Sequence, residues 1–332
     1  MRAPRALRLL SHCLPATAML LLVPGSFAQS PARAFPSKSI RFVVPYPPGG
    51  ASDVTARILG ARLTDAWQQP VVIDNRAGAN GIIALDLVAQ SAPDGYTILM
   101  ANLGPNAINP GVYSRLPYDA ENSFAPIVLT TIVPQVIVAN PALAVKSLAE
   151  MVAMAKGKPG QMRYGNGGNG SANHLAMELF RSMAGIDMQA IQYKGDGPAL
   201  ADVMSGNIDF ALPTVLAAIG NVKSGRLRAV AVTTRARVAS MPDVPTVSEQ
   251  GFAGYESVSW GGVMAPARTP RPVIDRLNAE VNRIIKQPDV AEKLQALGAE
   301  IVGGTPEAFA KYLRSEIAKW REVARKANVR LD

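Results

Sequence analysis

A regular alternation of short apolar runs and helical segments constrains the fold of this chain more than any other feature. Residues 40–44 form a β-branched and aromatic run, residues 54–67 place apolar side chains at helical spacing, and residues 70–73 form a second run. A helix over 82–91 and a strand over 96–100 follow. Because a strand–helix–strand order joins neighbouring strands in parallel, the pattern predicts an α/β layer architecture.

The remainder of the chain continues this alternation. The segment 127–139 is a long β-prone stretch, and a helix over 147–156 follows it. No low-complexity linker interrupts the chain, so we expect two closely connected lobes. The further predicted elements are strands near 162–164, 191–193, 208–211, 228–232 and 258–264, and helices beginning near 171 and covering 197–205, 273–286 and 306–327.

The N-terminus has the pattern of a secretory signal peptide. Three arginines within the first eight residues precede an apolar run over 16–23, and small residues at Ser26 and Ala28 provide a cleavage site. The run is far shorter than the roughly 20 residues that span a bilayer. We predict cleavage after Ala28 and export to the periplasm, with residues 32–34 as a second candidate cleavage site.

Composition excludes several kinds of site. One Cys and two His in 332 residues rule out a disulfide framework and a cysteine- or histidine-rich metal centre, so we predict no metal and no cofactor. The chain has 34 basic and 25 acidic residues, and residues 1–28 contain three Arg and no acid, so cleavage leaves a net charge of +6. Its basic residues are dispersed, and we expect no nucleic-acid partner.

Two glycine-containing loops between a strand and a helix are the candidate binding sites. In the first, 45–53, Gly49 and Gly50 let the backbone turn so that N–H groups point outward at a helix N-terminus. Such a loop suits a carboxylate or phosphate, although a plain tight turn explains it equally well. It lacks the Gly-Lys-Ser/Thr of a nucleotide loop. Ser52 or Asp53 is expected to be the N-cap of the following helix.

The second loop, 165–171, offers several backbone donors together with the Asn169 amide and the Ser171 hydroxyl. Ser171 or Asn173 is expected to cap the helix that follows. Asn102, at the end of the third strand, is expected to face the same crevice, because α/β proteins bind ligands at the carboxyl ends of strands. Two such loops in separate lobes could close on one small anion from opposite sides.

A Ser–His hydrolase is the alternative that the second loop raises. Ser171 and His174 lie three residues apart on one helical turn. However, no Gly-x-Ser-x-Gly surrounds the serine, and a capping serine is the commoner arrangement. We therefore predict no catalytic residue, with His174 packed beneath the loop.

Several motifs together resemble the tripartite tricarboxylate transporter substrate-binding family, the Bug-type receptors. The resemblance covers nearly the whole mature chain, in order. The segments that carry it are 44–57, 75–81, 93–97, 106–110, 164–174, 193–195, 206–209 and 260–266.

The resemblance implies a two-lobed periplasmic binding protein of the type II, flytrap kind, with two strands crossing between lobes. It implies a monomer that is not an enzyme, that captures a small organic acid through backbone amides and ordered waters, and that serves membrane subunits of such a transporter. A receptor for a signalling system is the alternative. The implied domains are a signal peptide over 1–28, a first lobe over 36–131 and about 256–300, a second lobe over about 132–255, and a C-terminal helix over 305–332 that packs on the lobes.

Ligand-binding residues carry over from the family position by position. Tyr46 is expected to lie against the ligand. Pro48, Gly49 and Gly50 are expected to frame one carboxylate, and the second loop is expected to supply further contacts. The carried-over residues are Tyr46, Pro48, Gly49, Gly50, Asp53 and Asn102 in the first lobe and Gly168, Asn169, Ser171, Tyr193, Gly195 and Asp209 in the second.

Three positions depart from the family pattern. Family members commonly have a small hydroxyl residue near Asn166 and near Gly104, and a phenylalanine is frequent at Tyr46. These departures concern the identity of the ligand rather than the mode of binding.

Overall fold

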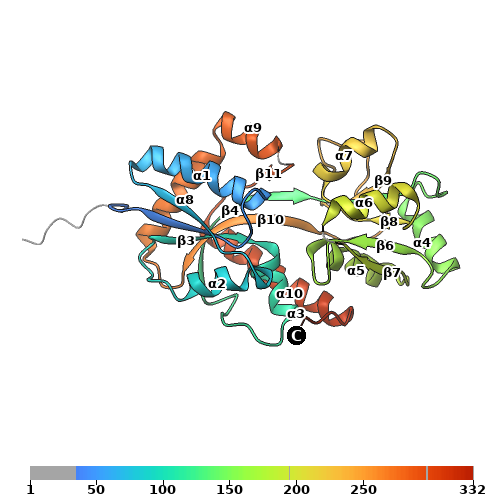
Figure 1. The fold of residues 1–332 in the computed structure, drawn as a ribbon, viewed down its shortest axis with the longest axis horizontal. Helices are drawn as coiled ribbons and strands as arrows, with labels where there is room; N and C mark the ends of the chain where they lie inside the picture. Colours follow the sequence, from blue (N-terminus) through green and yellow to red (C-terminus); the bar gives the residue numbers. More distant parts are fainter. Residues whose placement is uncertain (1–34, 194, 297, 332) are drawn as a thin grey trace, which may run out of the picture. The chain divides into compact units, whose positions relative to one another are not determined.

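Two β-sheets, each covered by helices on both faces, organise the protein in the computed structural model, which describes residues 35–331 except 194 and 297 (Figure 1). The predicted signal peptide lies outside the described residues. The first sheet has six strands in the order β11-β4-β10-β3-β1-β2, and the second has five in the order β7-β6-β8-β5-β9. We call each sheet with its helices a lobe.

The first three strands of the first lobe pair as the sequence predicts. Strand β1 (Ile40–Val44) lies between β2 (Val71–Asn75) and β3 (Thr97–Asn102), parallel to both. The connecting helices are α1 (Ala51–Trp67) and α2 (Ile82–Ala89). Parallel strands end at the same sheet edge, so the residues that follow β1 and β3 lie together.

The other strands make this sheet mixed. Strand β10 (Val258–Pro266) runs antiparallel to β3 and to β4 (Phe124–Pro134), and the short β11 (Glu300–Ile301) extends the sheet beyond β4. Alternate side chains of each strand point to opposite faces. Helices α1, α8 (Arg271–Ile285) and α9 (Pro288–Ala296) pack on one face, and α2 and α10 (Pro306–Lys326) on the other.

The β-prone stretch over 127–139 is not one strand. Strand β4 ends at Pro134 in the first sheet, and β5 (Val136–Ala139) belongs to the second. The chain returns to the first lobe between β9 (Arg228–Val232) and β10. The two crossings are joined by hydrogen bonds, because Thr233 N–H donates to Gln135 O (3.0 Å) and Ser257 N–H donates to Thr233 O (3.0 Å).

The second lobe repeats the parallel arrangement around one strand. Strand β6 (Arg163–Asn166) is parallel to β7 (Gln189–Gln192) and to β8 (Phe210–Ala211), whereas β5 is antiparallel to β8 and β9. The helices of this lobe are α4 (Leu148–Gly157), α5 (Ala172–Ala184), α6 (Asp196–Ser205) and α7 (Val215–Lys223).

Some elements differ from the predictions. The N-cap of α1 is Gly50, so Ser52 and Asp53 lie in the first turn of the helix, whereas Ser171 caps α5 as expected. Helices α7 and α9 were not predicted, nor were the short turns η1 (Ala79–Gly81), η2 (Gly104–Ile108) and α3 (Asn109–Val112).

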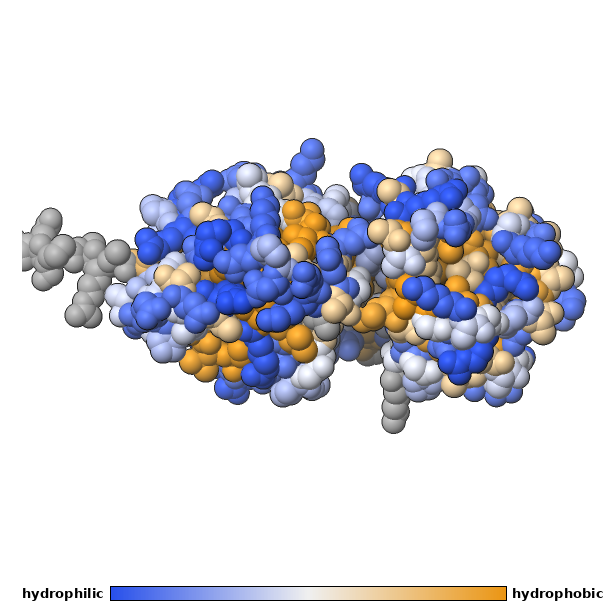
Figure 2. Space-filling view, turned by 90° about the horizontal axis from the view of Figure 1, so that it is seen from above, coloured by the Kyte–Doolittle hydropathy of each residue, from blue (hydrophilic) through white to orange (hydrophobic). Residues whose placement is uncertain are grey.

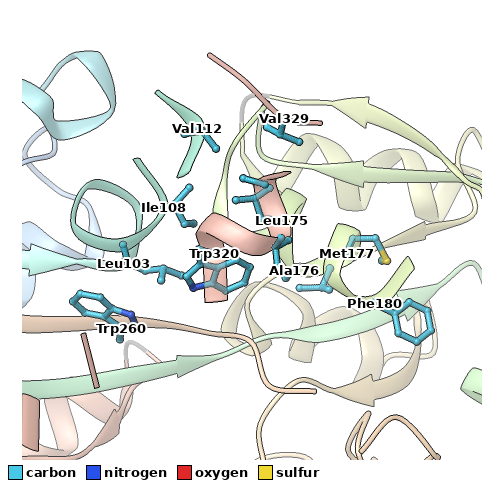
Figure 3. Packing of buried hydrophobic residues seen from close by; sticks show 14 of the residues in the cluster. Leu103, Ile108, Val112, Leu175, Ala176, Met177, Phe180, Trp260, Trp320 and Val329 are labelled. Atoms are coloured by element: carbon cyan, nitrogen blue, oxygen red, sulfur yellow. The ribbon is translucent and has the colours of Figure 1, made fainter. Parts of the chain in front are cut away.

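The largest apolar cluster includes residues of both lobes and of the C-terminal helix α10 (Pro306–Lys326). Figure 3 shows Trp320 of α10 with Leu103 and Ile108 of the first lobe and Leu175 and Ala176 of the second around it. Residues 306–326 therefore share one core with both lobes.

Apolar residues on the face shown in Figure 2 form small patches among mostly hydrophilic side chains. Among the described residues, no helix has both the length and the apolarity required to cross a membrane.

Candidate functional site

A pocket of about 430 Å³ lies where the carboxyl ends of β1, β3 and β6 meet. It takes residues from both lobes. Its lining consists of Tyr46, Ser52, Asn80, Asn102, Leu103, Gly104, Asn109, Gly167, Gly168, Asn169, Gly170, Ser171, Ala172 and Ser259.

The first loop is held in shape by the buried carboxylate of Asp53. Its Oδ2 accepts hydrogen bonds from Gly49 N–H (2.9 Å) and Arg57 Nε (2.9 Å), and its Oδ1 accepts from Asn75 Nδ2 (2.9 Å). Asn75 Nδ2 also donates to Tyr46 O (3.0 Å). The hydrogen bond from Arg57 lowers the pKa of Asp53 to about 2. Asp53 therefore positions the loop and lies outside the pocket lining.

The three residues expected to frame a carboxylate do not line this pocket. Pro48, Gly49 and Gly50 are exposed, and the pocket receives Tyr46 and Ser52 on either side of them. Gly49 has φ +88°, a conformation that favours glycine, so the diglycine serves the turn that starts α1.

Two departures from the family pattern meet in the pocket. A Cβ atom on Gly104 would lie 3.2 Å from the hydroxyl oxygen of Tyr46. Burial raises the pKa of Tyr46 to about 12, so this hydroxyl stays protonated at neutral pH and can donate a hydrogen bond. Gly104 thus leaves the space that the tyrosine hydroxyl uses.

Asn80 and Asn109 are lining residues that sequence reasoning missed. Asn80 has a left-handed backbone, with φ 51°, and its Nδ2 donates to the Tyr113 hydroxyl (2.8 Å). Asn109 Nδ2 donates to Asn80 O (3.1 Å). Both residues lie in segments that carried the family resemblance, which was the one available signal for them.

Asn102 lines the pocket at the end of β3, and only 9% of it is exposed. Its backbone N–H donates to Asn106 Oδ1 (2.9 Å), and its Nδ2 donates to Ser52 Oγ (3.0 Å). These bonds connect the end of β3 to the first turn of α1, so both strand ends present polar groups at one place.

The second loop is braced from below by three side chains. These side chains accept hydrogen bonds from three backbone N–H groups that the sequence had suggested were available to a ligand. The bonds run from Gly167 N–H to Asn173 Oδ1 (3.0 Å), from Gly168 N–H to Asn166 Oδ1 (2.9 Å) and from Gly170 N–H to His174 Nδ1 (3.1 Å).

Two donors of this loop remain available. Within the described residues, no hydrogen bond engages the N–H groups of Asn169 and Ala172, and both residues line the pocket. Ala172 is the first residue of α5, so the partial positive charge of the helix N-terminus adds to these donors.

The geometry of Ser171 and His174 does not match a nucleophile and its base. The Ser171 hydroxyl lies within donating distance of the backbone oxygen of Gly168 (2.6 Å) and of Asn173 Oδ1 (2.7 Å). Its Oγ also accepts a hydrogen bond from the His174 backbone N–H (3.4 Å). The imidazole Nδ1 accepts from Gly170 instead. Ser171 is therefore a helix cap, and His174 supports the loop.

Three other expected residues lie outside the pocket. The Tyr193 hydroxyl donates to Asp202 Oδ2 (2.6 Å), and Gly195 is the N-cap of α6. Asp209 Oδ2 accepts from Arg163 N–H (2.7 Å) at the start of β6. Since the second loop follows the other end of β6, Asp209 lies at the opposite edge of the sheet.

The pocket is polar and uncharged. None of the described residues that line it carries a charged side chain, and the first turns of α1 and α5 both reach it. The described part of the chain holds no group of three or more His, Cys, Asp or Glu that could bind a metal ion. The arrangement suits an anion held by neutral donors.

Comparison with known proteins gives the family. The model of the tripartite tricarboxylate transporter family receptor matches residues 55–329. The chain is 35% identical to protein BugT of Bordetella pertussis over 97% of this chain and 99% of that protein.

Solved structures agree with this match. An R. palustris protein solved with adipate is 35% identical, with a TM-score of 0.75 over 89% of this chain and 99% of that chain. MatC from Rhodopseudomonas palustris, solved with bound malate, is 30% identical, with a TM-score of 0.72 over 87% and 99%. The predicted two-lobed binding-protein fold is confirmed, and the chain belongs to the tripartite tricarboxylate transporter receptor family.

Proposed function

We propose that this protein is an exported receptor that binds a small organic carboxylate between its lobes, without altering it chemically. The observation that carries the proposal is a pocket with no charged side chain among its described lining residues, reached by the N-terminal turns of α1 and α5. A carboxylate there meets donors and no opposing carboxylate.

Neutral donors supply enough free energy for such a ligand. A charge-assisted hydrogen bond contributes about 1.5–3 kcal/mol, and a helix N-terminus about 0.3–1 kcal/mol. Micromolar affinity corresponds to about 8 kcal/mol, so a few such bonds suffice after the entropic cost of binding is subtracted.

The proposed binding residues revise the set expected from the sequence. Asn169 and Ala172 offer N–H groups from the second lobe, and Tyr46, Ser52 and Asn102 offer side chains from the first. Asp53, Gly49 and Gly50 contribute indirectly, because they set the start of α1. The relatives solved with adipate and malate support a four- to six-carbon acid as the ligand.

Thermal shift measurements on the mature, ligand-stripped protein test carboxylate recognition. The panel pairs each acid with its primary amide, for example succinate with succinamide. We expect at least one acid to raise the melting temperature in a concentration-dependent manner and its amide to fail, because a ligand that binds only the native state stabilises it. Equal shifts from acid and amide would contradict the proposal.

We propose that the receptor delivers its ligand to membrane subunits of a tripartite tricarboxylate transporter. The family match supports this role. Deleting the gene in the native host is expected to abolish uptake of the labelled acid. If uptake persists and only acid-dependent gene induction is lost, the protein serves a signalling system instead.

We also propose that the protein is periplasmic after cleavage following Ala28. The apolar run over 16–23 and the basic residues before it support this. N-terminal sequencing of protein from the periplasmic fraction is expected to begin at Gln29. Recovery of full-length chain in the membrane fraction would contradict it.

A further inference from the structure

A small recess opens from the pocket towards the first sheet. It has a volume of about 70 Å³, enough for a group of a few atoms. The recess shares Ser52, Asn102 and Ser259 with the pocket, and its other lining residues are Ala51, Thr55, Met100, Thr131, Val133, Trp260, Gly261 and Ala299. We call it the inner recess.

One buried polar atom of Asn102, a residue that lines both the pocket and the inner recess, has no partner. Among the described residues, no donor reaches Asn102 Oδ1, although the residue is only 9% exposed. The other polar groups of Asn102 are engaged, because Nδ2 donates to Ser52 and the backbone N–H donates to Asn106. A buried acceptor without a donor costs free energy, so the site favours a molecule that brings one.

Apart from the indole of Trp260, which donates to Glu316, the remaining polar side chains around the recess end in hydroxyl groups. Thr55 and Thr131 are 6% and 4% exposed, and no hydrogen bond engages their side chains in the described part of the chain. Ser52 and Ser259 add two more hydroxyls. None of the described lining residues of the recess is charged.

We propose that the inner recess binds an uncharged hydroxyl group of the ligand, which makes the ligand a hydroxycarboxylate. This inference rests on the proposed function, which places a carboxylate in the adjoining pocket. With the Asn102 amide as it stands in the structure, where Nδ2 donates to Ser52, a second carboxylate in the recess would bring only acceptors to Asn102 Oδ1. An ammonium group would be buried without a negative partner, which is costly.

A hydroxyl group also suits the recess in either orientation of the Asn102 amide. If the amide turns by 180°, its Oδ1 accepts from Ser52 and its Nδ2 faces the recess. A ligand hydroxyl group donates to Oδ1 in the first orientation and accepts from Nδ2 in the second. It can also donate to or accept from the neighbouring serine and threonine hydroxyls.

Calorimetric titrations with matched acids test the inference. The pairs are propionate with lactate, succinate with malate, and glutarate with 2-hydroxyglutarate, with both enantiomers of each hydroxy acid. In every pair that binds, we expect one enantiomer of the hydroxy acid to bind about tenfold more tightly, because an ordered water that replaces the hydroxyl carries an entropic cost.

Two near-isosteric variants assign the preference to the recess. In Thr131→Val and in Thr55→Val, which change residues of the recess that do not line the pocket, the affinity ratio within a pair is expected to fall towards one, while the affinity for the unsubstituted acid changes by less than about threefold. Thr55→Val serves if Thr131→Val does not fold, as judged by circular dichroism and thermal unfolding.

The outcomes separate this inference from the proposed function. If unsubstituted acids bind as tightly as their hydroxylated partners to the unmodified protein, the inference is wrong and the carboxylate receptor stands. The inference is also wrong if the ratio survives in the folded variants. If no acid of any pair binds to folded, ligand-stripped protein, the proposed function itself fails.

Discussion

At the scale of single residues, the N–H group of Ala172 gives the sharpest test of the second loop. Ala172 is the first residue of α5, and Ser171 before it has φ −68° and ψ 161°, which a following proline accepts. Ala172→Pro should therefore remove one donor and leave the helix intact. We expect carboxylate affinity to fall about tenfold in calorimetry, with little change in melting temperature.

The matched control is Ala172→Ser, which keeps the N–H group. Its affinity should remain within about twofold of the unmodified protein. If Ala172→Pro binds the acid as tightly as Ala172→Ser, the amide of residue 172 is not a ligand contact.

His174 makes the second loop sensitive to acid. Its Nδ1 accepts from Gly170 N–H (3.1 Å), and protonation of this nitrogen removes the acceptor. Burial lowers the pKa of His174, and the positive charge of Arg181 lowers it further, whereas the negative charge of Glu178 raises it. The ring of Tyr164 stacks on the imidazole. The pKa of His174 in the folded protein lies below its unfolded value of about 6.5. The neutral imidazole therefore makes its full contribution to the free energy of unfolding above about pH 6.5, and this contribution is lost as the pH falls.

We therefore expect carboxylate affinity and melting temperature to fall together as the pH drops below about 6.5. His174→Asn supplies an Oδ1 near the position of the imidazole Nδ1 and does not titrate in this range. This variant should bind with nearly constant affinity over the same interval. An unchanged pH profile in His174→Asn would show that another group is responsible.

Sequence reasoning recovered the residues whose role is local. Ser171 as a cap and His174 beneath the loop follow from spacing along one helix, and the structure has both. Which backbone donors remain free did not follow, because it depends on Asn166 and Asn173 folding back onto the loop. Asn80 reaches the pocket through tertiary packing, for which a single sequence has no periodic signal.

At the scale of elements, the segment after α10 connects the first lobe to the second loop. Leu331 N–H donates to Val112 O (2.9 Å), and a Cβ atom on Gly170 would lie 2.7 Å from Leu331 Cδ1. Gly170 and Gly185 both have a left-handed backbone, with φ +71° and +59°, but Gly185 has nothing within 4 Å of its Cβ position. An alanine would be strained by the backbone conformation at either position, but only at position 170 would its methyl group also meet a neighbouring side chain.

We expect Gly185→Ala to destabilise the protein by about 1 kcal/mol and to leave ligand affinity unchanged, because only the backbone conformation is strained. Gly170→Ala should cost about 2–3 kcal/mol and weaken binding, because the new methyl group also displaces Leu331 from the loop. Urea unfolding and calorimetry measure both effects. If Gly170→Ala and Gly185→Ala lose the same stability and bind the ligand with the same affinity, the contact of Leu331 with the second loop does not support binding.

The elements that the sequence predicted well are those with a clear apolar period, such as α10 and the strands β1 and β3. Helix α9 and the turns over 104–112 are short and rich in glycine, proline or charge, so they carry little periodicity. The continuous β-prone run over 127–139 conceals the passage between sheets, because both β4 and β5 are buried and apolar.

At the scale of the whole molecule, a buried polar cluster joins the two crossings between lobes. Thr233 Oγ1 accepts from Gln135 N–H (3.2 Å) and donates to Gln135 O (3.1 Å), and both residues are almost fully buried. Ser257 Oγ lies 3.3 Å from Gln135 Oε1. Every member has a partner, so the cluster fixes the backbone where the chain changes sheets.

Thr233→Val should therefore destabilise the protein by about 1–3 kcal/mol, because it leaves the buried Gln135 N–H without an acceptor. Urea unfolding is the measurement, and the exposed Ser240→Ala is the control, expected within about 0.5 kcal/mol of the unmodified protein. A Thr233→Val protein as stable as the control would mean that the cluster does not matter for stability.

The fold class and the family could be predicted for the whole molecule because many motifs matched in order along the chain. The identity of the ligand could not, since it depends on how Tyr46, Gly104 and Asn102 meet across two strand ends. The pocket is made by residues that are far apart in sequence, and their spacing carries no information about its shape.

Calorimetric titration of the mature, ligand-stripped protein with small organic acids shows whether the pocket binds a carboxylate. We predict that at least one acid binds with one molecule per chain and a Kd near the micromolar range, and that Ala172→Pro weakens this binding about tenfold. Folded protein that binds none of the acids, or that binds one equally well after Ala172→Pro, would contradict the proposed site.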